Sequence, residues 1–137
     1  MLALTAAASD REWKRHPSVD EELNSSTCVF VGDVVRARQV LDAGHFVQGT
    51  FYAVRVQELL KGNPPKQVEI YDENSSGRFP MRFGVRYILV AYEGVFEGVR
   101  GPRLAIDSCG NSGTLKQAGR VLATTRNLKQ TKAQPKD

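Results

Sequence analysis

The chain has 137 residues, of which 41% are hydrophobic and 25% are charged, which is the composition of one globular domain. No stretch approaches the ~18 consecutive apolar residues of a membrane-spanning helix. Six basic residues and one acidic residue lie after residue 113, while residues 1–113 carry 13 basic and 14 acidic residues. The body is therefore almost neutral. A basic C-terminal segment of this kind is typical of a solvated helix and tail.

Residues 1–17 are interpreted as an N-terminal extension. They contain an Ala6-x-Ala8 pattern, after which signal peptidases cut, but no basic segment precedes it. We interpret this stretch as the remainder of an export signal, which predicts a secreted or periplasmic protein. A cytoplasmic protein with a frayed end is the alternative.

The pattern of apolar residues predicts a mainly β domain over residues 18–130, followed by a disordered tail at 131–137. Ser18 and Glu21 form a capping box, which predicts a helix over residues 19–24. Two long strands, at residues 28–40 and 48–60, flank a short turn that contains glycine and should form a hairpin. Three further strands and an amphipathic helix are predicted at residues 67–71, 85–92, 103–108 and 114–129.

Five strands with a short helix before them and an amphipathic helix after them predict a Greek-key barrel like the OB-fold. Gly32 lies in the middle of the long first strand, where a bend or bulge would let that strand curl around the barrel. We expect the C-terminal helix to close the barrel. The residues then expected to be buried together are Val31, Val54, Val56, Leu89 and Val121.

Four strings in a fixed order carry a family resemblance. They are Val-Phe-Val-Gly-Asp-Val-Val at residues 29–35, Val54-x-Val56 followed by Leu-Leu-Lys-Gly62, Gly84-x-x-Tyr-Ile-Leu-Val-Ala91, and Ser108-Cys109 followed by Gly-Asn-Ser. In this order they resemble the netrin-like module shared by tissue inhibitors of metalloproteinases and their bacterial relatives, over residues 21–128. The resemblance implies an exported OB-like barrel, held by disulfides, with a packed C-terminal helix.

In the animal inhibitors, an N-terminal cysteine chelates the zinc of the target protease. No cysteine precedes Cys28 in this sequence. Cys109 matches the family cysteine at the end of the fifth strand, but its usual N-terminal partner is missing. We therefore expect no inhibition through an N-terminal zinc chelate.

The two cysteines, Cys28 and Cys109, lie too far apart for a CxxC zinc or redox motif. Two interpretations stay open. The cysteines form a disulfide bridge if their strands meet, or they are two buried and inert thiols.

No catalytic or metal-binding constellation is found. Asp72 and Glu73 are neighbours on a strand and point to opposite faces, whereas a general acid–base pair needs convergent carboxylates. His16 and His45 have no partners at metal-ligand spacing. The sequence therefore predicts a protein that is not an enzyme and that uses no cofactor or metal.

The leading hypothesis is a protein-interaction module whose partner is a protein, with proteases as one candidate class. Loops on a rigid barrel commonly carry binding function, so residues 79–83 and 93–101 are the predicted contact loops. The predicted contact residues are Phe79, Met81, Phe83, Phe96 and Arg100. A structural domain of a larger assembly is a further hypothesis.

The alternative from another class is a single-stranded nucleic-acid-binding OB domain. Such a domain needs exposed aromatic rings beside a basic groove. The near-neutral body argues against it. Its candidate residues are Phe51, Tyr52, Tyr87 and Tyr92 for stacking, and Arg36, Arg38, Arg55 and Arg86 for charge.

Overall fold

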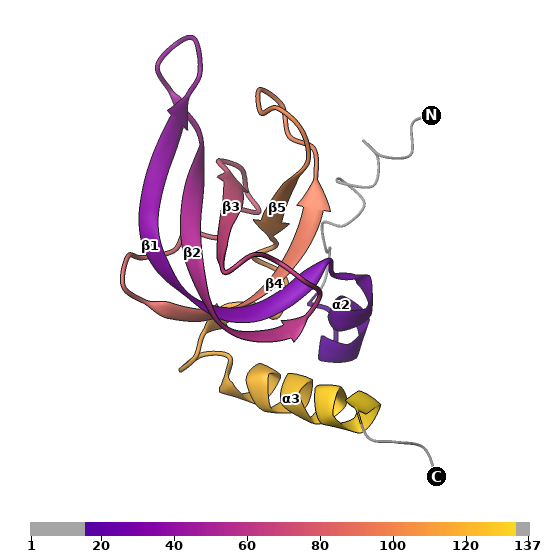
Figure 1. Cartoon of the computed structure of the whole chain (residues 1–137). Coiled ribbons are helices and arrows are strands. Elements are labelled where there is room, and N and C mark those ends of the chain that lie inside the picture. The colour runs from indigo at the N-terminus through magenta and orange to yellow at the C-terminus, as the bar shows by residue number, and fades with distance from the viewer. Residues whose placement is uncertain (1–15, 134–137) are drawn as a thin grey trace.

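A computed structural model describes residues 16–133, with side chains described through residue 129. The fold is mainly β, as expected (Figure 1). The elements are α2 (Val19–Ser25), β1 (Cys28–Leu41), β2 (Val47–Lys61), β3 (Gln67–Glu73), β4 (Arg86–Gly94), β5 (Arg103–Ile106), β6 (Gly113–Thr114) and α3 (Gly119–Ala133). The five predicted strands lie within two residues of β1–β5. Most of the expected N-terminal extension, and residues 134–137 of the expected tail, lie outside the described residues.

The first five strands form a closed ring. β1 pairs with β2, β2 with β3, β3 in parallel with β5, β5 with β4, and β4 back with β1. The ring closes because β1 is long enough to pair on both edges, from Cys28 opposite Ala91 to Asp33 opposite Arg86. A Cβ on Gly32 would come within 2.5 Å of the Val54 Cγ1 atom, and the β1–β2 register shifts beside this glycine. The irregularity predicted at Gly32 is therefore confirmed.

The apolar residues form two separate cores, so the prediction of one shared core is wrong. Val54 and Leu89 lie inside the ring, with Val56 half-buried against them. Val31 and Val121 belong to a second core outside the ring, between the strands and the two helices. Side chains alternate between the faces of a strand, and here both faces of the first half of β1 and of most of β4 are buried. Helix α3 lies below the strands in Figure 1, and it packs in this second core outside the ring instead of contributing to the inner core.

Helix α2 begins at the predicted capping box. The Ser18 hydroxyl accepts a hydrogen bond from the Glu21 amide at 3.1 Å, and the Glu21 carboxylate accepts one from the Ser18 amide at 3.1 Å. The next residue, Glu22, is only 1% exposed. Its carboxylate accepts hydrogen bonds from the Tyr92 hydroxyl at 2.5 Å and from the Asn111 amide and side chain. This network fastens α2 to β4 and to the segment after β5.

Helix α3 begins five residues later than predicted. Thr114 and Gln117 exchange side-chain to backbone hydrogen bonds at 3.1 and 3.2 Å, which form a separate turn before the helix. Thr114 also belongs to the short strand β6, which the sequence analysis did not predict. The helix then extends to Ala133, beyond the expected end at Lys129.

Candidate functional site

Two loops project from the same end of the ring, and we call them together the loop end (Figure 1). They are the β1–β2 turn at residues 42–46 and the β4–β5 loop at residues 95–102. The Asp42 carboxylate organises the first loop, because it accepts hydrogen bonds from the Gly44 amide at 2.8 Å and the Phe46 amide at 3.0 Å. Such Asx turns give a short loop a defined backbone.

The β4–β5 loop is hydrogen-bonded to the start of β2, directly after the turn of the hairpin. The Gln48 side chain donates a hydrogen bond to the Glu97 carbonyl. The Phe96 ring packs on Tyr71, with 5.2 Å between the ring centroids, and Tyr71 packs in turn on Phe51 at 4.8 Å. Gly98 has φ of 74°, a conformation that favours glycine, and the end of the Gln48 side chain lies directly against it. The two loops therefore form one connected surface.

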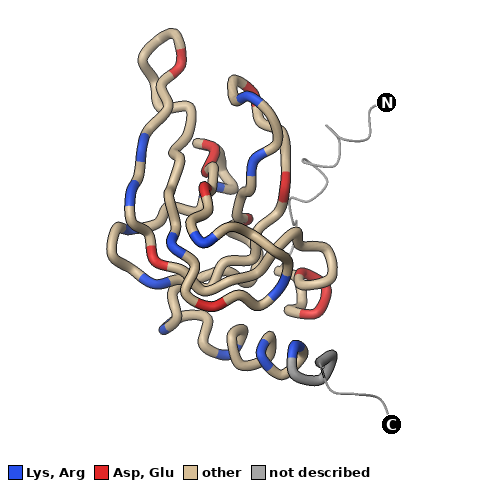
Figure 2. Tube along the Cα trace, in the orientation of Figure 1, with Lys and Arg blue, Asp and Glu red and all other residues tan. Residues whose placement is uncertain are grey.

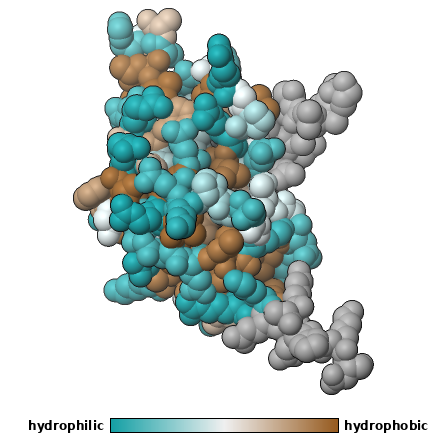
Figure 3. Space-filling view, in the orientation of Figure 1, coloured by the Kyte–Doolittle hydropathy of each residue, from teal (hydrophilic) through white to brown (hydrophobic). Residues whose placement is uncertain are grey.

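Large apolar side chains are exposed at the loop end. Phe46 is 72% exposed at the hairpin tip, Leu41 is 50% exposed beside it, and Val95 is 47% exposed on the second loop. Apolar side chains are visible just below the hairpin tip in Figure 3. An exposed apolar group held on a rigid loop is the usual anchor of a protein–protein contact. Leu41, Phe46 and Val95 were not predicted from the sequence as contact residues, although an aromatic residue directly after a polar turn is a usable signal.

The structure separates the contact residues predicted from the sequence. Met81 is buried in the inner core, and Phe79 is half-buried against that core with its ring edge on Tyr87. Phe83 is 76% exposed, but it lies beside β1 rather than at the loop end. Phe96 packs on Tyr71, and Arg100 is exposed on the same loop.

Phe83 lines an open hollow of about 590 Å³ beside β1. Its polar lining includes Asp33, Arg55 and Arg86. Asp33 and Arg86 form an ion pair at 2.8 Å, and the Arg86 guanidinium holds the pKa of the Asp33 carboxyl below its ordinary value of 3.8. The carboxylate thus neutralises part of the positive charge of this hollow.

The aromatic residues considered for nucleic-acid stacking are buried. Phe51, Tyr52, Tyr87 and Tyr92 are between 5% and 8% exposed, so none of them offers a free ring face. The arginines do share the outer face of the ring, since Arg36 lies opposite Ala53, Arg38 opposite Phe51, and Arg86 opposite Asp33. Basic residues follow one another along β1 in Figure 2. The structure provides the charge of such a site but buries these four rings.

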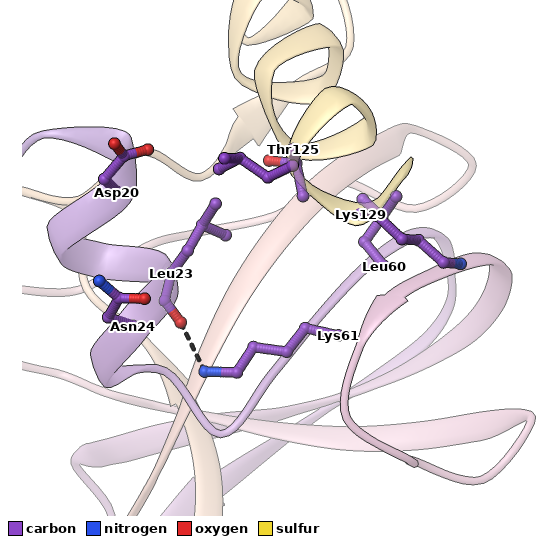
Figure 4. Close-up of a pocket in the computed structure, with 8 residues that line it drawn as sticks. Asp20, Leu23, Asn24, Leu60, Lys61, Thr125 and Lys129 are labelled. Atoms are coloured by element: carbon purple, nitrogen blue, oxygen red, sulfur yellow. Dashed lines mark hydrogen bonds between the residues drawn. The ribbon is translucent and has the colours of Figure 1, made fainter. Parts of the chain in front are cut away.

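A second groove, of about 500 Å³, lies between α2, the later part of α3 and the end of β2 (Figure 4). Leu23, Leu60 and Leu128 supply its apolar lining. The Lys61 amine points to the end of α2 and donates to the carbonyls of Leu23 and Ser26, the latter at 2.7 Å. This lysine therefore satisfies carbonyls at the end of the helix, which intrahelical hydrogen bonds leave open.

Both cysteine thiols are free, so the bridge that the sequence analysis left open is not formed. Cys28 lies in the inner core, and burial raises the pKa of its thiol to about 11. Cys109 is exposed on the loop after β5, where the His16 imidazole lies 3.1 Å from its carbonyl. A buried thiol with a raised pKa is a poor nucleophile. The alternative of two buried thiols holds for Cys28 and is wrong for Cys109.

Among the described residues, no three His, Cys, Asp or Glu side chains lie where they could jointly hold a metal ion. In the same part of the chain, no helix has the length and apolar character needed to cross a membrane.

Burial raises the pKa of Asp72 above its ordinary value, although its carboxylate accepts a hydrogen bond from the Phe79 amide at 2.7 Å. This acid fixes the loop after β3.

No protein-family model matches the chain, and a search of curated proteins finds no relative.

Proposed function

We propose that this chain is an exported, non-catalytic protein-interaction module that contacts its partner through the loop end. The observation that carries the proposal is the exposure of Phe46 on a turn whose backbone the Asp42 carboxylate fixes. Val95, on the loop that Gln48 fastens to the hairpin, extends the apolar surface. A rigid apolar anchor loses little entropy on binding, which favours tight association.

We further propose that the ring is an OB-like Greek-key barrel. Two features support this assignment: the order β1-β2-β3-β5-β4, and the long β1 strand that pairs with both β2 and β4. The resemblance to the netrin-like module points to the same architecture and to an extracellular protease as the partner class.

An inhibition assay tests this function. The chain is assayed against a panel of zinc and serine proteases, together with a Phe46→Ser/Val95→Ser variant. Phe83→Ser is the matched control, because it removes an equally exposed ring from a loop outside the loop end. We expect inhibition by the wild-type chain and by Phe83→Ser, and a loss of about tenfold or more in the loop-end variant. A panel with no inhibited protease, or a loss confined to Phe83→Ser, would contradict the proposal.

A further inference from the structure

The two halves of β1 have different neighbours. From Cys28 to Asp33, β1 pairs with β2 on one edge and with β4 on the other. Val34 is the last residue bonded on the β4 side, through Val85 at 3.4 Å and Gly84 at 3.0 Å. Over residues 36–41, the pairings of β1 within the described part of the chain are all with β2. We call residues 36–41 the open edge.

The change occurs because both strands leave the shared ladder at the same place. In β1, the register with β2 shifts between Val34 and Arg36, so Val35 is an extra residue that bends the strand. On the other side, the chain before β4 makes a turn closed by the Val85 amide and the Arg82 carbonyl. Gly84, with φ of 77°, lies in that turn. The segment before the turn therefore leaves the edge of β1.

Alternation along the strand shows which backbone groups the open edge presents. The Asp42 amide donates to the Phe46 carbonyl at 2.9 Å, so the backbone of Asp42 faces β2. Successive residues of a strand direct their N–H and C=O groups to opposite edges. Counting back from Asp42, the groups of Ala37, Gln39 and Leu41 point to the unpaired side. An unpaired row of this kind is a template for another strand.

The open edge is also accessible from both faces. The side chains at residues 36–39 are all exposed, whereas the pattern along Cys28–Val34 is almost wholly buried. Figure 1 shows this part of β1 at the outside of the molecule, with β2 on one side only. A second strand can therefore approach without displacing any described element.

The charge of the edge selects the partner. Arg36 and Arg38 face outward together, because Ala37 between them lies opposite Tyr52 of the inner core. The Arg38 guanidinium is held 4.8 Å from the centre of the Phe51 ring. The acids on either side of these arginines are already engaged, because Asp33 is paired with Arg86 and the Asp42 carboxylate accepts hydrogen bonds from amides of its turn. Residues directly opposite across a sheet interact strongly, and like charges there are destabilising. A second copy paired antiparallel about Ala37 would place Arg36 opposite Arg38, whereas an acidic strand would pair with both arginines.

We infer that the open edge binds an extended acidic segment of another protein by strand addition, with carboxylates at alternate positions facing Arg36 and Arg38. Main-chain hydrogen bonds to Ala37, Gln39 and Leu41 supply affinity, and the arginines supply specificity. This inference rests on the proposed protein-binding function. It names the chemistry of the bound segment, which the apolar loop end does not.

Fluorescence anisotropy with labelled peptides tests the inference. The probe is a peptide in which Glu alternates with Thr and Val. One control has the same composition but carries all its Glu residues in a block, and the other is the alternating sequence N-methylated at every amide, which removes the donors from both edges and so blocks strand pairing. We expect the alternating peptide to bind about tenfold or more tightly than either control. Equal binding of the block peptide, or of an oligothymidylate of matched charge, would overturn strand addition.

Variants of Gln39 separate backbone pairing from charge. Gln39→Pro removes the outward amide, at a position where an edge strand tolerates proline, and should weaken the alternating peptide about tenfold. Gln39→Ala keeps the amide and should bind within about twofold of wild type. Arg36→Glu/Arg38→Glu should exchange the preference for Glu for one for Lys, while Arg120→Glu on exposed α3 should not. Retained binding by Gln39→Pro, or a dimer in sedimentation that this variant abolishes, would overturn the inference.

The protease panel keeps this claim distinct from the proposed function. If the chain binds the alternating peptide but inhibits no protease, strand addition at the open edge is supported and protease inhibition is ruled out. If the chain inhibits a protease through the loop end but binds no alternating peptide, strand addition is ruled out and the proposed function of the loop end is supported.

Discussion

The two halves of β1 belong to one strand but have opposite surroundings. The first half is paired on both edges, faces the inner core with Phe30, and is covered outside by α2 and α3 through Val29 and Val31. The second half is paired on one edge and exposed on both faces. The first half therefore holds the ring together, and the second is free to bind. Burial of the first half thus stabilises the ring on which the unburied second half is presented.

The largest expected effect is in the covered half. Phe30 is 0% exposed inside the ring, so Phe30→Ala should lower the free energy of unfolding by about 3–5 kcal/mol. Phe83→Ala, at an exposed ring beside the same strand, should change it by less than about 0.5 kcal/mol. Urea denaturation measures both. Similar losses in the two variants would break the distinction between covered and exposed surroundings.

The next effect concerns the attachment of α2 over the covered half. Glu22→Ala removes the buried carboxylate that accepts from the Tyr92 hydroxyl and the Asn111 amide, which should cost about 2–3 kcal/mol. Glu22→Gln keeps one acceptor oxygen and should cost less. Thermal melts of the two variants rank these losses. A melting temperature unchanged by Glu22→Ala would show that this network does not hold the helix.

A smaller effect is expected at the boundary between the halves, where Asp33 pairs with Arg86. The hydrogen bond from the Arg86 guanidinium lowers the pKa of Asp33 below 3.8, so the folded protein binds this proton less readily than the unfolded chain. The pair therefore stabilises the fold above about pH 4, and its contribution is lost as the pH falls through the lowered pKa. Asp33→Asn should lower the free energy of unfolding at pH 7 by less than Glu22→Ala does. It should also make the fall in this free energy between pH 5 and pH 2 less steep. The same fall in the variant as in wild type would contradict the lowered pKa of Asp33.

The smallest effect is expected in the open half. Gln39→Ala touches no core and removes no pairing with β2, so stability should stay within about 0.5 kcal/mol of wild type. Equilibrium unfolding in urea measures it. A loss comparable to that of Phe30→Ala would show that the open edge is covered in solution.

Much of the fold was predictable because local patterns agreed with it. The capping box at Ser18 predicted the start of α2, and two long strands on either side of a turn that contains glycine predicted the β1–β2 hairpin, as observed. The two-residue strand β6 and the late start of α3 were not predictable. They depend on Thr114, which pairs with Tyr87 across the sheet and exchanges bonds with Gln117.

The candidate site was less accessible to sequence reasoning. Residues 79–83 look like an exposed apolar loop, but Met81 fills the ring interior, and of the two rings Phe79 is half-buried and Phe83 is exposed. The burial of Glu22 could have been anticipated, because it lies on the same helical face as Val19 and Leu23. The open edge could not have been anticipated from the sequence. It exists because the pairing between β1 and β4 ends at Val34, and only the structure shows where that pairing ends.

Amide hydrogen exchange along β1 tests the central claim most directly, because it compares the two halves in one experiment. In the free protein, we expect slow exchange at Phe30 to Val34 and at the β2-facing amides of Arg38 and Val40, and fast exchange at Ala37, Gln39 and Leu41. Saturation with the alternating Glu peptide should slow these three amides selectively. Slow exchange at Ala37, Gln39 and Leu41 in the free protein, or no change on adding the peptide, would contradict the account.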